Sequence, residues 1–374
     1  MREPYRPLLI VHVVWHPLCA SAEMIAEELL ATLFEDHRDL TVHGLRIPVR
    51  LWSGFGGELH APPPAPIRTD DAERTVVVVL VDDEFLAADG WPEHLAELAS
   101  ASDQDRLHFL PVALSPHALR LSGPAAAYNW VRAYQRMDDT RQAFVVNSIV
   151  HGLLELLTAD TLTVFLSHAK LDGEPVAERV GSFLQRSTKV DNWFSRHDIP
   201  HGSRWADEIR GAARRNLLLV VRSDAYATRQ WCRIEVLEAK AAGSPVVVLD
   251  VLESGEDRSF PYLGNGPVVR WSPDPTPAMQ EHLLTVILLE ALRFEYFPLR
   301  VGGLCRLRGV PQPRYILPRP PELLGLLSVL EARVDDAGSM IYPDPPLGTE
   351  ELELVGRLLP GLVPTTPTAL LSGG

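Results

Sequence analysis

One predicted helical turn combines an aromatic ring with a carboxylate, a pairing that suits ligand chemistry. Trp231 and Glu235 stand four residues apart and therefore share one face of this helix. The helix follows a continuous apolar segment, Leu217–Val221, that is typical of a strand buried on both faces. We expect Glu235 to lie beside a flat apolar surface near the carboxyl edge of a sheet, where open α/β folds bind ligands.

Other reactive residue types give weaker signals. Cys232 lies next to Trp231, but no histidine is placed to activate it, so we expect a small buried residue. His197 and His201 have no third ligand nearby, and no metal site is predicted. The sequence lacks the glycine patterns of Rossmann dehydrogenases and of P-loop NTPases, which argues against both classes.

The elements that must position these residues occur twice along the chain. In each half an apolar strand leads through a polar turn into a helix, and two further apolar strands follow. Strands that alternate with helices predict an α/β fold with parallel sheets covered on both faces. The predicted strands are Leu8–Trp15, Arg74–Val81 and Leu107–Leu114 in the first half, and Thr161–Ser167, Leu217–Val221 and Val246–Leu252 in the second.

We interpret this repeat as an internal duplication, with domains at residues 1–158 and 159–274. Residues 275–374 are expected to form a helical, proline-rich C-terminal extension. It begins with an apolar helix from Met279 to Phe297, which Pro298 is expected to end because proline lacks a backbone N–H.

The bulk properties of the chain limit its partners. Its 374 residues carry a net charge of −14, which disfavours nucleic acid and anionic membranes. The apolar runs are too short to cross a bilayer, and no charged-then-apolar secretory leader opens the sequence. Three widely spaced cysteines argue against a disulfide framework. We therefore expect a cytoplasmic protein.

Four segments in the second half resemble, in the right order, the Toll/interleukin-1 receptor (TIR) domain family. Val164–Lys170 is similar to the family's first strand, which ends in Ser-His or Ser-Tyr. Val190–Trp205 is similar to the second strand and the BB loop that follows it. Leu217–Tyr226 resembles the third strand with its Ser-x-x-Tyr turn, and Trp231–Glu235 resembles the helix start that holds the catalytic glutamate. The match covers residues 161–270.

The resemblance implies a fold and an activity. Both sheets would be flavodoxin-like, and the protein would be a bacterial-type NAD⁺ glycohydrolase that cleaves the nicotinamide–ribose bond. The products would be nicotinamide and either ADP-ribose or a cyclic ADP-ribose. NAD⁺ would be the substrate, and no cofactor is expected. Activity would serve anti-phage or abortive-infection immunity. A homo-oligomer or filament, or an upstream sensor protein, would switch it on.

The implied site is centred on Glu235 as the catalytic residue. Cleavage of a ribose bond passes through an oxocarbenium-like transition state, which a nearby carboxylate stabilises. Phosphate, hydroxyl and aromatic contacts would bind the rest of the substrate. The implied substrate-binding residues are Ser167, His168 and Lys170 at the phosphates, Phe194, Trp205, Tyr226 and Trp231 at the base or ribose, and Asp198 at a hydroxyl.

The first half lacks these features. Leu95, not a carboxylate, stands four residues after Trp91, and Trp15 and His16 replace the Ser-His pair of the second half. We therefore interpret residues 1–158 as a degenerate TIR-like copy with a regulatory or assembly role.

Two other functions stay open. The chain could be a non-catalytic TIR scaffold that binds partners through its loops, or a protein that binds a nucleotide signal. In the second case the segment Tyr342–Gly348 would complete a ligand pocket. The spacing between Trp231 and Glu235 favours the enzyme.

Overall fold

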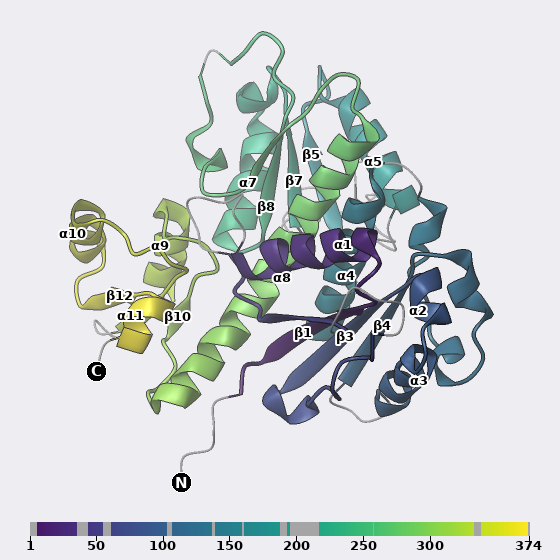
Figure 1. The fold of residues 1–374 in the computed structure, drawn as a ribbon. Helices are drawn as coiled ribbons and strands as arrows, with labels where there is room; N and C mark the ends of the chain where they lie inside the picture. Colours follow the sequence, from purple (N-terminus) through teal and green to yellow (C-terminus); the bar gives the residue numbers. More distant parts are fainter. Residues whose placement is uncertain are drawn as a thin grey trace, which may run out of the picture. The chain divides into compact units, whose positions relative to one another are not determined.

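A computed structural model gives the fold of most of the chain. Contacts between Cα atoms divide the chain into two compact units, Met1–Leu153 and Leu154–Gly374, and each unit contains parallel strands (Figure 1). The described residues are 6–35, 44–54, 61–102, 107–136, 139–158, 161–187, 193–194, 217–256, 258–332 and 338–372, with only the backbone described for 193–194.

The first unit is built on a parallel sheet whose described strands run in the order β2-β1-β3-β4. Val13 of β1 lies opposite Leu51 of β2 on one side and Val78 of β3 on the other. The apolar runs of β1 and β3 are almost entirely buried, as expected for inner strands of a parallel sheet. The elements are β1 (Leu9–Trp15), β2 (Val49–Ser53), β3 (Arg74–Val81), β4 (Leu107–Ala113), α1 (Ala20–Leu30), α2 (Asp83–Ala87) and α3 (Trp91–Ala101), followed by α4 (Arg141–Leu157), which crosses the boundary between the units.

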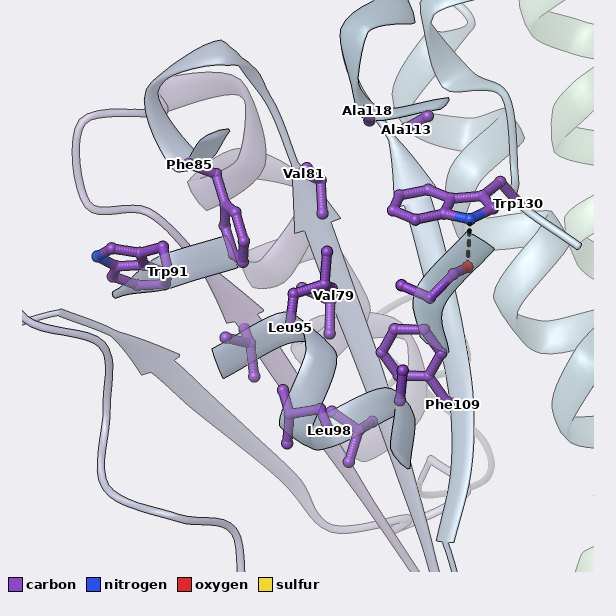
Figure 2. Close-up of a cluster of buried hydrophobic side chains, with 14 of the residues drawn as sticks. Val79, Val81, Phe85, Trp91, Leu95, Leu98, Phe109, Ala113, Ala118 and Trp130 are labelled. Carbon is purple, nitrogen blue, oxygen red and sulfur yellow. Dashed lines mark hydrogen bonds between the residues drawn. The ribbon is translucent and has the colours of Figure 1, made fainter. Parts of the chain in front are cut away.

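Helices α2 and α3 of the first unit present aromatic and leucine side chains to the sheet. Figure 2 shows Phe85, Trp91 and Leu95 beside Val79 of β3. The rings of Trp91 and Phe85 meet edge-on with centroids 4.9 Å apart. Trp91 Nε1 donates a hydrogen bond of 2.7 Å to the Ala61 carbonyl. A buried leucine or phenylalanine contributes roughly 1.5–3 kcal/mol, so this cluster fixes α3 on the sheet.

The second unit contains a parallel sheet with the described order β6-β5-β7-β8-β9. In chain order this is 2-1-3-4-5, the order of flavodoxin-like folds. The prediction of α/β units with parallel sheets is therefore confirmed. The elements of this sheet and its helices are β5 (Val164–His168), α5 (Glu174–Ser187), β6 (Trp193–Phe194), β7 (Leu217–Arg222), α7 (Gln230–Ala241), β8 (Val246–Asp250), β9 (Val268–Arg270) and α8 (Pro277–Arg308).

Both faces of this second sheet are covered. Phe165, Val220 and Val248 belong to the buried cluster that also contains Val236 of α7. The strand positions that alternate with them, such as Leu219, are also buried. Because successive strand residues point to opposite faces, burial at both sets means that helices cover both sides.

Helix α8 continues past Pro298, so the prediction that this proline ends the helix is wrong. Proline removes one backbone hydrogen bond and disfavours a helix interior. Here the following turns bury Val301 and Cys305 against Ile341 of the C-terminal segment, and this burial offsets the loss. The helix ends instead at Gly309, whose positive φ of 67° suits a glycine cap.

The C-terminal extension contains a small parallel sheet that the sequence did not reveal. Its described strands run in the order β10-β11-β12. Met340 and Tyr342 are buried in its core with Val355 and Leu359. The elements are β10 (Tyr315–Ile316), α9 (Leu323–Glu331), β11 (Gly338–Ile341), α10 (Thr349–Leu358), β12 (Leu362–Thr365) and α11 (Pro367–Ser372).

Candidate functional site

The predicted residues meet at the carboxyl ends of β5 and β7. After β7 the chain turns through the short helix Tyr226–Thr228, and α7 then begins at Gln230. β5 and β7 are neighbours, with Ser167 opposite Val220. Helix α7 packs against both strands, which brings its first turns beside the end of β5.

A buried hydrogen-bonded chain links Glu235 to the sheet. Ser167 Oγ donates to Glu235 Oε2, and the Tyr226 hydroxyl lies 2.6 Å from the same Oγ. The Tyr226 hydroxyl also lies 3.3 Å from the Cys232 carbonyl oxygen, to which it can donate. Ser167, Tyr226 and Glu235 are each at most 1% exposed. A buried carboxylate requires such partners, because an isolated one is costly to remove from water.

A cavity of about 480 Å³ lies next to these hydrogen-bonded side chains, because His168 and Cys232 line it. The described residues of its walls are 168–171 after β5 and 229–232 at the start of α7. Lys170 and Arg229 bring two cations to it, and Trp231 brings an aromatic ring. Glu235 does not line the cavity but lies one helical turn further along α7 from Trp231. Cations beside an aromatic surface suit a ligand that carries both phosphate and a planar ring.

Two aspartates fix loops that follow the strands of this sheet. Asp172 accepts a hydrogen bond of 2.6 Å from Ser223 Oγ and one of 2.8 Å from the Ala225 N–H, which ties the loop after β5 to the turn after β7. Asp224 accepts hydrogen bonds from the backbone N–H groups of residues 253–255. These N–H groups, led by that of Ser254, hold the pKa of Asp224 below its usual range.

The structure separates the predicted site residues into three groups. His168, Lys170 and Trp231 line the cavity, whereas Ser167, Tyr226 and Glu235 form the buried chain. The ring of Tyr226 is 0% exposed, so it serves here as a hydrogen-bond partner, and its contact with a base or ribose stays a prediction. Phe194 belongs to β6, whose backbone alone is described, and Asp198 and Trp205 lie outside the described residues.

Arg229 and Asp172 were not predicted from the sequence. Arg229 stands directly before α7 and lines the cavity, so its place two residues before Trp231 could have drawn attention to it. Asp172 acts through Ser223 and Ala225, which are distant in sequence. No local pattern could have indicated that contact.

The segment Tyr342–Gly348 does not line this cavity. Tyr342 is buried in the core of the C-terminal extension, and its hydroxyl accepts a hydrogen bond of 2.9 Å from the Leu347 N–H. Among the residues that the structure describes, those lining the cavity come from 168–171 and 229–232. A ligand pocket completed by this segment therefore has no support in the described structure.

The corresponding edge of the first unit is filled differently. Leu95 is 1% exposed and belongs to the apolar core. A buried carboxylate, Asp82, follows β3, and its Oδ1 accepts a hydrogen bond of 2.9 Å from the Phe85 N–H. Burial raises the pKa of Asp82 to about 6. The described strand order matches that of the first four strands in the other unit, but descent from a TIR domain stays a prediction.

Among the described residues, no group of three or more His, Cys, Asp or Glu side chains could hold a metal ion. Cys19, Cys232 and Cys305 are free thiols, and all three are buried. Cys232 Sγ donates to the His168 carbonyl at 3.4 Å. Within the described part of the chain, no helix is long and apolar enough to cross a membrane.

In the comparison with known proteins, the family match falls in the second unit. The family model of the TIR domain matches residues 164–276. No curated protein matches the chain. A crystal structure described as a tagatose-6-phosphate ketose/aldose isomerase from Clostridium novyi NT is 8% identical, with 79% of this chain and 80% of that chain covered. Its TM-score of 0.23 is too low to assign a fold or a function. With the strand order, the cavity and the buried glutamate on the same segment, residues 164–276 of this chain are a TIR domain.

Proposed function

We propose that this protein is an NAD⁺ glycohydrolase whose catalytic residue is Glu235. One observation carries the proposal: a buried carboxylate on α7 stands one turn from Trp231, which lines a cavity together with two cationic residues. A TIR domain makes this activity the first to test, since the family includes enzymes that cleave NAD⁺.

The chemistry needs a carboxylate near the ribose. The bond between C1′ of the ribose and the nicotinamide nitrogen breaks, and its electron pair leaves with nicotinamide, which becomes neutral. The ribose passes through an oxocarbenium-like state that the negative charge of Glu235 stabilises. Water then adds to C1′ and loses a proton, giving ADP-ribose; attack by a nitrogen of the adenine gives a cyclic product instead.

The cavity supplies binding for the rest of the substrate. Lys170 and Arg229 meet the diphosphate, and Trp231 stacks on a planar base. His168 contributes a polar wall between them. No cofactor takes part, because NAD⁺ is itself the substrate, and the protein works in the cytoplasm, where this dinucleotide is available.

In the resting protein a substrate cannot reach Glu235, and assembly gives it access. Glu235 is 1% exposed and does not line the cavity, so a substrate ribose reaches it only after neighbouring residues move. Formation of a homo-oligomer or filament, or contact with an upstream sensor protein, provides that movement. Control of this kind suits anti-phage immunity, in which uncontrolled loss of NAD⁺ would harm the cell.

The experiment is incubation of the purified chain with NAD⁺, at high protein concentration and with a crowding agent. Chromatography and mass spectrometry follow nicotinamide, ADP-ribose and its cyclic form. Wild type and Glu238→Gln, a change one turn further along the same helix, are expected to release nicotinamide, and Glu235→Ala is not. Equal release by all three proteins would remove Glu235 from the mechanism.

A scaffold role is the second candidate, and one observation favours it for the first unit. Leu95 occupies the helix position of Glu235 and is part of the apolar core, so that edge holds no carboxylate at that spacing. Absence of NAD⁺ cleavage under every condition, together with self-association of the chain, would favour this function for the whole protein.

A further inference from the structure

We propose that Ser167 and Tyr226 are positioning residues for Glu235, and that their two hydroxyl groups hold its carboxylate in the charged form. The inference rests on the proposed function for the role of Glu235, but its geometry stands independently. It gives these two residues a task other than contact with the substrate.

The three side chains come from three different elements. Ser167 lies in β5, Tyr226 in the short helix after β7, and Glu235 in α7. Their backbones are fixed: Ser167 pairs with Val220 of the next strand, and the Tyr226 N–H donates to the Ser223 carbonyl at 3.0 Å. The oxygen of each hydroxyl therefore has little freedom to move away from its neighbour.

The number of protons shared by Glu235, Ser167 and Tyr226 depends on the charge of Glu235. With the carboxylate ionised, Ser167 donates to Glu235 and Tyr226 donates to Ser167, which uses both hydroxyl protons. The Tyr226 hydroxyl has a single proton, for which Ser167 Oγ and the Cys232 carbonyl oxygen compete as acceptors. With Glu235 protonated, the direction of the first two bonds reverses: the carboxylic acid donates to Ser167, and Ser167 donates to Tyr226.

The distances favour donation from Tyr226 to Ser167. The Tyr226 and Ser167 oxygens are 2.6 Å apart, which is within the range of a good O–H···O bond. The Tyr226 oxygen is 3.3 Å from the Cys232 carbonyl oxygen, a longer and therefore weaker contact. A hydroxyl that itself accepts a hydrogen bond is a stronger donor, so Tyr226 strengthens the bond from Ser167 to the carboxylate.

Removing either hydroxyl should make the charged carboxylate less favourable. Tyr226→Phe keeps the buried ring and removes the hydroxyl that contacts Ser167 Oγ and the Cys232 carbonyl oxygen. Ser167→Ala removes the donor to Glu235 directly, whereas Ser167→Thr retains a hydroxyl on a strand, where a β-branched residue fits. Hydrogen bonds to the charged form favour that form, so both losses raise the pH at which Glu235 takes up a proton.

The test has two readouts. The first is the pH dependence of nicotinamide release: Tyr226→Phe and Ser167→Ala are expected to move the acidic limb upward by about one pH unit, a tenfold change in proton affinity. In both variants kcat falls more than KM changes, and Ser167→Thr restores most of the wild-type profile. Thr228→Val removes an exposed hydroxyl bonded to the Ala225 carbonyl in the same turn, and its profile should equal that of wild type.

The second readout does not need catalysis. Carbon-13 NMR of protein labelled at glutamate carboxyl groups, with Glu235→Gln for assignment, follows the titration of Glu235 directly. The midpoint of this titration should rise in Tyr226→Phe and should equal the wild-type value in Thr228→Val. Unchanged midpoints in both hydroxyl variants would overturn the positioning role, whatever the activity. If the midpoint of Glu235 rises in Tyr226→Phe but the wild-type protein cleaves no NAD⁺, the proposed function is refuted and the positioning role of the two hydroxyl groups stands.

Discussion

Replacing Glu290 by glutamine should loosen the second unit more than any surface change of the same kind. Glu290 lies in α8, and its side chain is 2% exposed. Arg319 Nε donates to Glu290 Oε1 at 3.0 Å, while its Nη2 donates to Oε2. Arg293 Nε lies 3.7 Å from Oε2. The substitution therefore removes a buried negative charge that both guanidinium groups approach.

The magnitude follows from the burial of the three groups. The side chains of Arg319 and Arg293 are 12% and 5% exposed, so solvent screens the interaction little. Breaking a buried ion pair by removing one partner costs about 3–5 kcal/mol. For a unit of this size each kcal/mol lowers Tm by about 2–4 °C, so we expect a decrease of about 6–20 °C.

Scanning calorimetry of the whole chain measures this change. Asp70→Asn provides the control, because it breaks an exposed ion pair with Arg68 at 3.2 Å and should leave Tm unchanged. The double variant Glu290→Gln, Arg319→Met should recover part of the loss, since it also removes the buried positive charge. A decrease for Glu290→Gln no larger than that of the control would mean that this ion pair does not stabilise the unit.

Three further outcomes concern the first unit. Trp91→Phe leaves the Ala61 carbonyl without its indole donor and should cost about 1–3 kcal/mol in urea unfolding; a cost near zero would mean that water replaces the bond. Burial lowers the pKa of His12 to about 4, so the unfolded chain binds this proton first, and stability should fall as pH drops from about 6.5 to about 4. His12→Gln should lack that part of the pH dependence in urea midpoints, and an identical slope would contradict the shift. Burial raises the pKa of Cys19 to about 11, so iodoacetamide at pH 8 should label this thiol only after denaturation, as intact mass would record; rapid labelling of the native chain would disprove it.

The parts of the fold that the sequence predicted are those with long, regular patterns. The apolar runs of β3 and β7 indicated buried parallel strands, and the spacing of Trp231 and Glu235 indicated a shared helix face. Both features are local, because each depends on residues within one turn or one strand. Contacts with the rest of the chain seldom change the structure that local patterns of this length predict.

The missing parts depend on contacts between distant residues. Strands of two to four residues, such as β10 and β11, are too short to show a period of two, so the small C-terminal sheet was not predicted. The continuation of α8 past Pro298 depends on burial of Val301 against Ile341, which a local rule for proline ignores. The hydrogen bond from Ser223 to Asp172 could not be predicted for the same reason.

We propose that the Glu235 carboxylate carries the chemistry, and a comparison of rates between variants tests this claim. Glu235→Gln keeps the size of the side chain and an oxygen that can accept from Ser167, while it removes the charge and replaces the other oxygen by an NH₂ group. With folding verified by circular dichroism, the initial rate of nicotinamide release from NAD⁺ should fall about 10²–10³-fold relative to wild type. The Glu238→Gln variant should retain the wild-type rate. A Glu235→Gln rate within twofold of wild type would contradict the claim.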